Sequence, residues 1–129
     1  MTADPIAVPH GTSMLRMLAL IQGLFYLATG VWPLFDIDSF QKVTGPKTDL
    51  WLVRTVGVLI AVVGVVLLLS YRSQRVTDEV IVLAIGCAIG LAAIDLIYSL
   101  SGRISPVYLA DAAAEIALAA LWGYARLRT

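Results

Sequence analysis

Four long apolar stretches constrain this chain more than any other feature of its sequence. A helix needs about 20 residues to cross the hydrocarbon core of a bilayer. Each stretch is near that length, and together they cover residues 14–32, 50–71, 78–100 and 106–124. The chain is 60% hydrophobic, whereas soluble domains are about 45–50% apolar. We therefore expect one integral membrane domain over residues 1–129.

The spans are expected to be helices. In hydrocarbon, backbone polar groups must be satisfied within the protein, which leaves helices or a closed β-barrel. Barrel strands would alternate in hydropathy over segments of about ten residues, and the sequence lacks that pattern. It predicts an all-α bundle of four transmembrane helices with up-down-up-down topology. Pro33 fits the end of the first span, Thr77 an N-cap for the third, and Ser105-Pro106 the start of the fourth.

The distribution of basic residues gives a narrow topology signal. The side with both termini carries Arg16, Arg72, Arg75, Arg126 and Arg128, and the other side carries Lys42, Lys47, Arg103 and, near the boundary, Arg54. This bias favours cytoplasmic termini in a membrane of the bacterial inner-membrane type. The first apolar run is long for a signal peptide and lacks a cleavage motif, so we expect it to be retained. With formal charge zero and no basic block, a nucleic-acid partner is disfavoured.

Charged residues inside the expected spans are the strongest functional signal. An acid at the bilayer centre costs at least roughly 2.5 kcal/mol on insertion scales, so it commonly marks a functional site. Helical rise places Asp95 and Asp111 roughly 8 Å inside one boundary, Glu115 one turn deeper, and Arg54 about 6 Å inside. All four occupy one half of the membrane, on the side predicted to face away from the cytoplasm. Arg54 could instead snorkel to the interface.

Other spans offer polar groups to the same centre. Gln22, Tyr26 and Thr29 follow an i, i+4, i+7 pattern, which is one stripe of the first helix. Tyr98 shares a face with Asp95, three residues before it. We interpret these groups with the acids as a candidate ligand- or proton-binding site. Interhelical hydrogen bonding is the alternative interpretation for the Gln22 stripe.

Small and aromatic residues indicate how the helices pack. Gly86 and Gly90 form a GxxxG pair in the third span, and Gly57, Ala61 and Gly64 line the second, so both faces predict close helix approach. Five aromatic residues near span ends predict an interfacial aromatic belt: they are Trp32, Trp51, Tyr98, Tyr108 and Trp122. The connection over residues 36–46 fits either a short surface helix or a plain loop.

The residue types limit the chemistry. No histidine or second cysteine lies near the acids, so zinc or copper is disfavoured, and the ligand set is thin for a hard cation. We therefore predict no metal, and no cofactor is identified. Nucleophile motifs are absent. Acid–base chemistry on a lipid-soluble substrate stays open, so the sequence does not decide whether the protein is an enzyme. Three acidic side chains and one arginine leave an excess of negative charge, which protons or a cationic ligand could neutralise.

Three interpretations follow. The first is a membrane protein whose buried acidic pocket binds a small cationic or lipid-like molecule. The second is a proton-coupled transporter or pore that acts as a homo-oligomer, because four short helices enclose little lumen. The third is a structural or assembly subunit whose charges pair across helices or with a partner. A pocket open sideways to lipid would favour the first, and one that reaches both membrane faces would favour the second.

Overall fold

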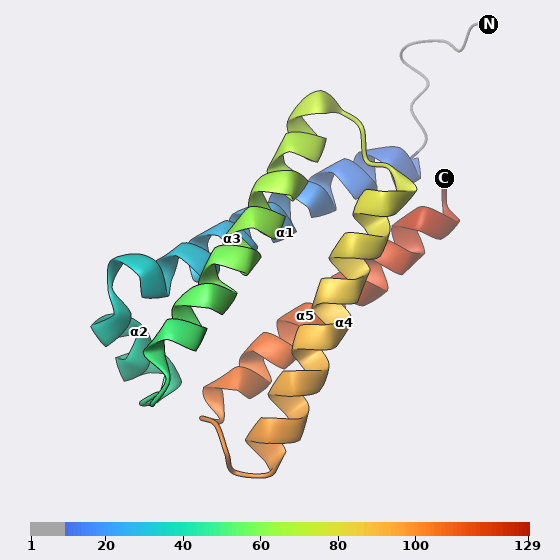
Figure 1. Ribbon diagram of the computed structural model, residues 1–129. Coiled ribbons are helices and arrows are strands. Elements are labelled where there is room, and N and C mark those ends of the chain that lie inside the picture. Colours follow the sequence, from blue (N-terminus) through green and yellow to red (C-terminus); the bar gives the residue numbers. More distant parts are fainter. Residues whose placement is uncertain (1–9) are drawn as a thin grey trace, which may run out of the picture.

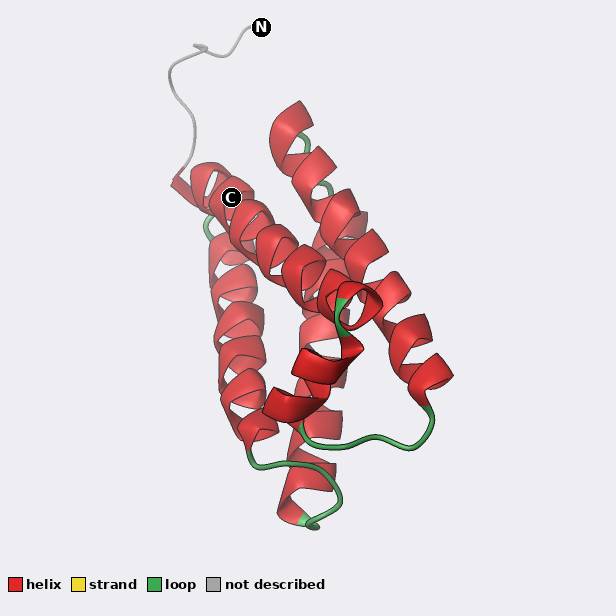
Figure 2. Cartoon of the chain, turned by 90° about the vertical axis from the view of Figure 1, so that its left-hand side faces the viewer, coloured by secondary structure: helices red, strands yellow, loops and turns green. Residues whose placement is uncertain are grey.

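A computed structural model describes residues 10–129, which form five helices. Their bounds are α1 (His10–Phe35), α2 (Ile37–Thr44), α3 (Leu50–Ser73), α4 (Asp78–Leu100) and α5 (Val107–Leu127) (Figure 1). The four long helices, all but α2, are apolar and long enough to cross a membrane. They run alternately up and down (Figure 2). The helix α2 and a loop connect α1 to α3, and short loops make the other two connections. The predicted four-helix membrane bundle is thereby confirmed, and the chain is a small polytopic membrane protein.

The bundle consists of two tightly packed pairs. α1 packs along α3, and α4 packs along α5. α1 and α5 join the two pairs, whereas α3 and α4 contact each other little. The pairs diverge away from the α3–α4 turn (Figure 1). The bundle is therefore closed along the α1–α5 seam and loosely closed between α3 and α4.

Glycines allow α1 and α3 to approach closely. A Cβ atom built on Gly30 would lie 2.5 Å from Gly57 O and from Ala61 N, and one on Gly64 would lie 2.6 Å from Leu27 N. Such distances are shorter than any normal contact, so larger side chains would force the helices apart. Backbone approach of this kind drives helix association in lipid, where apolar burial alone gives little. The predicted small-residue face of residues 57–64 is confirmed.

The second glycine prediction is wrong. A Cβ atom on Gly86 or Gly90 would meet nothing within 4 Å, and both residues are exposed on α4. Instead α4 turns Ala84, Ala88 and Ala92 towards the core, where all three are buried. The alanines and the glycines both repeat every four residues, and the two series are offset from each other by two positions. Spacing alone therefore could not identify which face of α4 is buried.

The helix ends agree with the sequence in part. Thr77 is the N-cap of α4, and its Oγ1 accepts a hydrogen bond from Val80 N (3.4 Å). The fourth span starts one residue later than expected, because Pro106 and not Ser105 is the N-cap of α5, although Ser105 Oγ accepts from Val107 N (3.3 Å). Pro33, however, does not end α1, which continues to Phe35. The Pro33 ring packs near Gly57, whose missing side chain leaves room for it. The segment after Asp36 folds as a helix, α2, with Asp36 Oδ1 accepting from Ser39 N (3.1 Å).

The crossing of α1 and α3 yields the first test. Gly30→Ala should lower the free energy of unfolding by about 1–3 kcal/mol, because the added methyl group overpacks against α3 backbone. Gly86→Ala is the matched control. It should change the free energy of unfolding by about 0.5 kcal/mol or less, because the added methyl group would contact no residue of a neighbouring helix. Thermal unfolding in detergent, followed by circular dichroism, measures both. Equal effects of the two substitutions would contradict the assigned crossing.

Candidate functional site

The divergence of the helix pairs leaves a cavity in the half of the bundle next to α2. Its volume is about 480 Å³, and its lining includes residues from all five helices. Most of the wall is apolar, with Phe25 from α1, Ile60 from α3 and Leu91 from α4. Phe40, Val43 and Thr44 of α2 line it as well, so this short helix covers the end of the cavity. The site is therefore an apolar chamber with a few polar groups.

The three membrane acids line this one cavity. Asp95 comes from α4, and Asp111 and Glu115 come from successive turns of α5. Asp95 is 4% exposed and Glu115 1% exposed, while Asp111 is half-buried. The packing of α4 along α5 brings Asp95 and Asp111 to the same cavity.

Glu115 is held in place by a tyrosine. Tyr26 Oη donates a hydrogen bond to Glu115 Oε1 at 2.7 Å, and both side chains are buried. The bond joins α1 to α5 across the seam between the two helix pairs. A short bond to a carboxylate in a low-dielectric site is stronger than a neutral one, so it fixes the acid against the cavity wall.

Asp95 differs from Glu115 because one of its oxygens lacks a partner. Asp95 Oδ2 is buried and makes no hydrogen bond to any residue in 10–129. A buried polar atom without a partner costs roughly 1–3 kcal/mol, and more when it is charged. Three carboxyl groups in one cavity cannot all ionise without a counter-charge. Protonation of the carboxyl groups, or a positive charge beside ionised ones, would each meet this requirement.

A polar layer closes the cavity towards the other end of the bundle. Trp122 Nε1 donates to Gln22 Oε1 (2.7 Å), and Gln22 Nε2 donates to Ala84 O (3.1 Å). Gln22, Trp122 and Leu67 are fully buried, and none of them lines the cavity. The predicted stripe of α1 is thus divided, with Tyr26 and Thr29 at the cavity and Gln22 in the packed layer. Trp122, predicted for the interfacial belt, is a core residue because Gln22 satisfies its indole N–H.

Two of the proposed site residues lie away from the acids. Arg54 is exposed on α3 and does not line the cavity, as expected for a side chain that snorkels to the interface. Tyr98 is 38% exposed and also lies outside the lining. Thr29 does line the cavity, but its hydroxyl donates to Phe25 O at 2.8 Å within α1. The acids therefore receive no counter-charge from Arg54.

Sequence reasoning missed Lys47, the cation that does line the cavity. Its ammonium donates to Thr44 O (3.0 Å) and Gly45 O (2.8 Å), and it lies over the rings of Phe40 and Tyr108. Burial lowers the pKa of Lys47. Because these partners occupy the ammonium, Lys47 fastens the end of α2 to α5 and does not pair with an acid within residues 10–129. The sequence did not indicate this role for Lys47, because the residue lies in a loop and its position depends on how α2 folds.

The cavity has a mouth on the lipid-facing side. Leu52 and Val56 of α3 and Ile94 of α4 both line the cavity and are exposed, at 43%, 48% and 51%. Leu52 and Val56 lie near the start of α3 and Ile94 near the end of α4, and the two helices diverge towards those ends (Figure 1). On the opposite side the α1–α5 seam is closed by the Tyr26–Glu115 bond. The opening therefore faces the surrounding bilayer.

Neither a metal cluster nor a relative adds to this geometry. In the part of the chain that the structure describes, no group of three histidine, cysteine or acidic side chains is arranged to hold a metal ion. Comparisons with protein-family models, curated proteins and solved structures find no match to this chain. The site must be interpreted from its own residues.

The Tyr26–Glu115 bond yields the second test. Tyr26→Phe should lower the free energy of unfolding by about 1–3 kcal/mol, because it leaves a buried carboxyl oxygen without its donor. Tyr98→Phe removes the same hydroxyl from an exposed side chain with no hydrogen-bond partner among the described residues, and should have little effect. Thermal unfolding of both variants in the same detergent measures the difference. Two equally stable variants would show that the bond contributes nothing to the seam.

Proposed function

We propose that this protein binds an amphipathic molecule that carries an amine, taken from the surrounding membrane. The observation that carries the proposal is a buried acidic wall, formed by Asp95 and Glu115 with Asp111, in an otherwise apolar cavity of about 480 Å³. A protonated amine would supply the counter-charge that the acids lack. The apolar wall would take the hydrocarbon part of the same molecule.

The mouth between α3 and α4 supports entry from lipid. A molecule dissolved in the bilayer could pass Val56 and Ile94 without crossing the polar headgroup layer. The covering helix α2 limits access from water at that end. Such an arrangement suits a ligand with low solubility in water, for which the bilayer is the reservoir.

The filled core favours a binding pocket over a pore through one copy of the chain. Beyond Glu115 the bundle interior is occupied by Gln22, Trp122 and Leu67, all fully buried. An ion or small solute would have to displace this layer to reach the far end. A proton-coupled transporter would need either that displacement or a path between copies, and an assembly subunit would use the acids for a partner chain.

The third test measures ligand binding directly. Native mass spectrometry of the detergent-solubilised protein should show binding of dodecylamine, and weaker binding of dodecanol and dodecanoate. Glu115→Gln keeps an acceptor for Tyr26 and should weaken binding of the amine roughly 10–100-fold, because a charge-assisted hydrogen bond is lost. Asp38→Asn removes an exposed acid of α2 at the same end and is the matched control.

The outcomes separate the three interpretations. Amine binding that is lost in Glu115→Gln, with unfolding temperature retained, supports the pocket. Equal binding of the amine, alcohol and carboxylate would overturn the role of the acids. Loss of folding or of an oligomer in Asp111→Asn would support the assembly role instead. Comparing small molecules that copurify with wild type and with Glu115→Gln would then identify the natural ligand.

The fourth test concerns the mouth. Val56→Trp should slow association of a fluorescent long-chain amine in nanodiscs, because a larger side chain narrows the gap between α3 and α4. Val58→Trp introduces the same side chain on the same helix at an equally exposed position outside the cavity, and should leave the rate unchanged. Stopped-flow fluorescence measures both rates. An unchanged rate in Val56→Trp would argue for entry from the aqueous side.

A further inference from the structure

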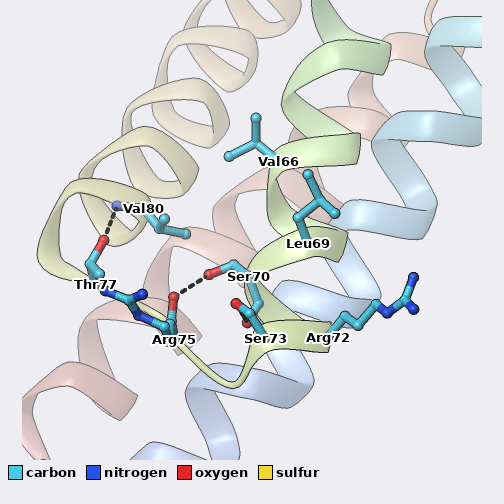
Figure 3. A pocket seen from close by; sticks show the side chains of 8 residues that line it. All are labelled: Val66, Leu69, Ser70, Arg72, Ser73, Arg75, Thr77 and Val80. Atoms are coloured by element: carbon cyan, nitrogen blue, oxygen red, sulfur yellow. Dashed lines mark hydrogen bonds between the residues drawn. The ribbon is translucent and has the colours of Figure 1, made fainter.

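A second hollow lies at the opposite end of the bundle, at the α3–α4 turn. Its volume is about 600 Å³. Figure 3 shows its apolar part, with Val66 and Leu69 on α3 facing Val80 on α4. Ser73, Arg75 and Thr77 lie towards the turn, and Arg72 lies on the outer side of α3. The hollow therefore has an apolar groove between α3 and α4, with basic and hydroxyl groups at the turn that joins them.

The turn that carries the basic groups is held firmly. Ser70 Oγ donates to Arg75 O at 2.7 Å (Figure 3), and Arg75 N donates to Ser70 O at 3.1 Å. Gln74 adopts the left-handed conformation with φ 58°, which reverses the chain there. Thr77 Oγ1 caps the start of α4. The positions of Arg72 and Arg75 are therefore set by hydrogen-bonded backbone.

Arg72 and Arg75 are the basic side chains of this end, within residues 12–129, that have no partner. Arg126 pairs with Asp78 at 3.0 Å, Arg16 lies over the Tyr71 ring, and Arg128 lies over the Tyr124 ring. The guanidinium groups of Arg72 and Arg75 make no hydrogen bond or ion pair with any residue from 12 to 129. No acidic side chain lines the hollow.

We propose that this hollow binds the headgroup of an anionic phospholipid, with one acyl chain in the groove between α3 and α4. The apolar lining belongs to the ends of two candidate spans, and the arginines follow at the turn, so the hollow lies where acyl chain meets headgroup. Arginine matches phosphate by bidentate hydrogen bonding, and Ser73 and Thr77 add hydroxyl groups. This site is separate from the acidic cavity and does not depend on its ligand.

The fifth test compares lipids in native mass spectrometry. Wild type should retain phosphatidylglycerol more strongly than phosphatidylcholine. Arg72→Gln combined with Arg75→Gln should weaken binding of phosphatidylglycerol roughly 30-fold, at about five-fold for each arginine near the headgroup. Arg128→Gln removes an arginine at the same end but outside the hollow, and should preserve binding. Equal retention of the two lipids by wild type would overturn the proposal.

The groove needs its own variant, because arginines alone could attract any anion. Val66→Phe keeps both arginines and fills the groove, so it should weaken binding of phosphatidylglycerol while its unfolding temperature stays near that of wild type. Inorganic phosphate should compete poorly with the lipid. Should phosphate displace the lipid at equal concentration, or should Val66→Phe bind the lipid as wild type does, the assignment to a phospholipid would fail.

Discussion

The seam between α1 and α5 is the constraint on which the rest of the bundle depends. Apolar contact gives little net attraction between helices in lipid, so close packing and buried hydrogen bonds decide how they associate. Two such bonds cross this seam, from Tyr26 to Glu115 and from Trp122 to Gln22. They join two pairs that are each closely packed on their own. Because the pairs are joined along one side, they can diverge on the other, and that divergence creates the cavity and its mouth.

The same interactions explain why the bundle is open in one half and filled in the other. Next to the α3–α4 turn, Leu67 and Trp122 occupy the centre with no exposed surface. Next to α2, the central positions are taken by carboxyl groups, which cannot pack as hydrocarbon does. Glu115 lies at the border and is satisfied by Tyr26, whereas Asp95 keeps an oxygen without a partner among the described residues. The cavity begins where the packing stops being apolar.

The sequence could predict the spans and the depth of the acids, because hydrophobic length and helical rise determine both. It could also place Asp95, Asp111 and Glu115 in one half of the membrane, and the structure brings all three to one cavity. It could not decide rotation about each helix axis. Arg54 is near the acids in depth but faces outward, since a long basic side chain gains by reaching the interface. Lys47 was missed because its place depends on how α2 folds back, which no periodicity encodes.

Charged side chains have different surroundings at the two ends of the bundle, and their depth in the membrane explains the difference. An acid in the cavity loses its hydration, so its counter-charge must come from a neighbour or from a bound molecule. An arginine at the α3–α4 turn remains exposed and keeps its hydration, so it is tolerated without a partner. Under the proposed function, a ligand that cannot donate a proton or supply a positive charge would leave the cavity acids unsatisfied. The exposed arginines restrict the choice of ligand less. In the proposed lipid site, only their position next to an apolar groove selects a lipid over a free anion.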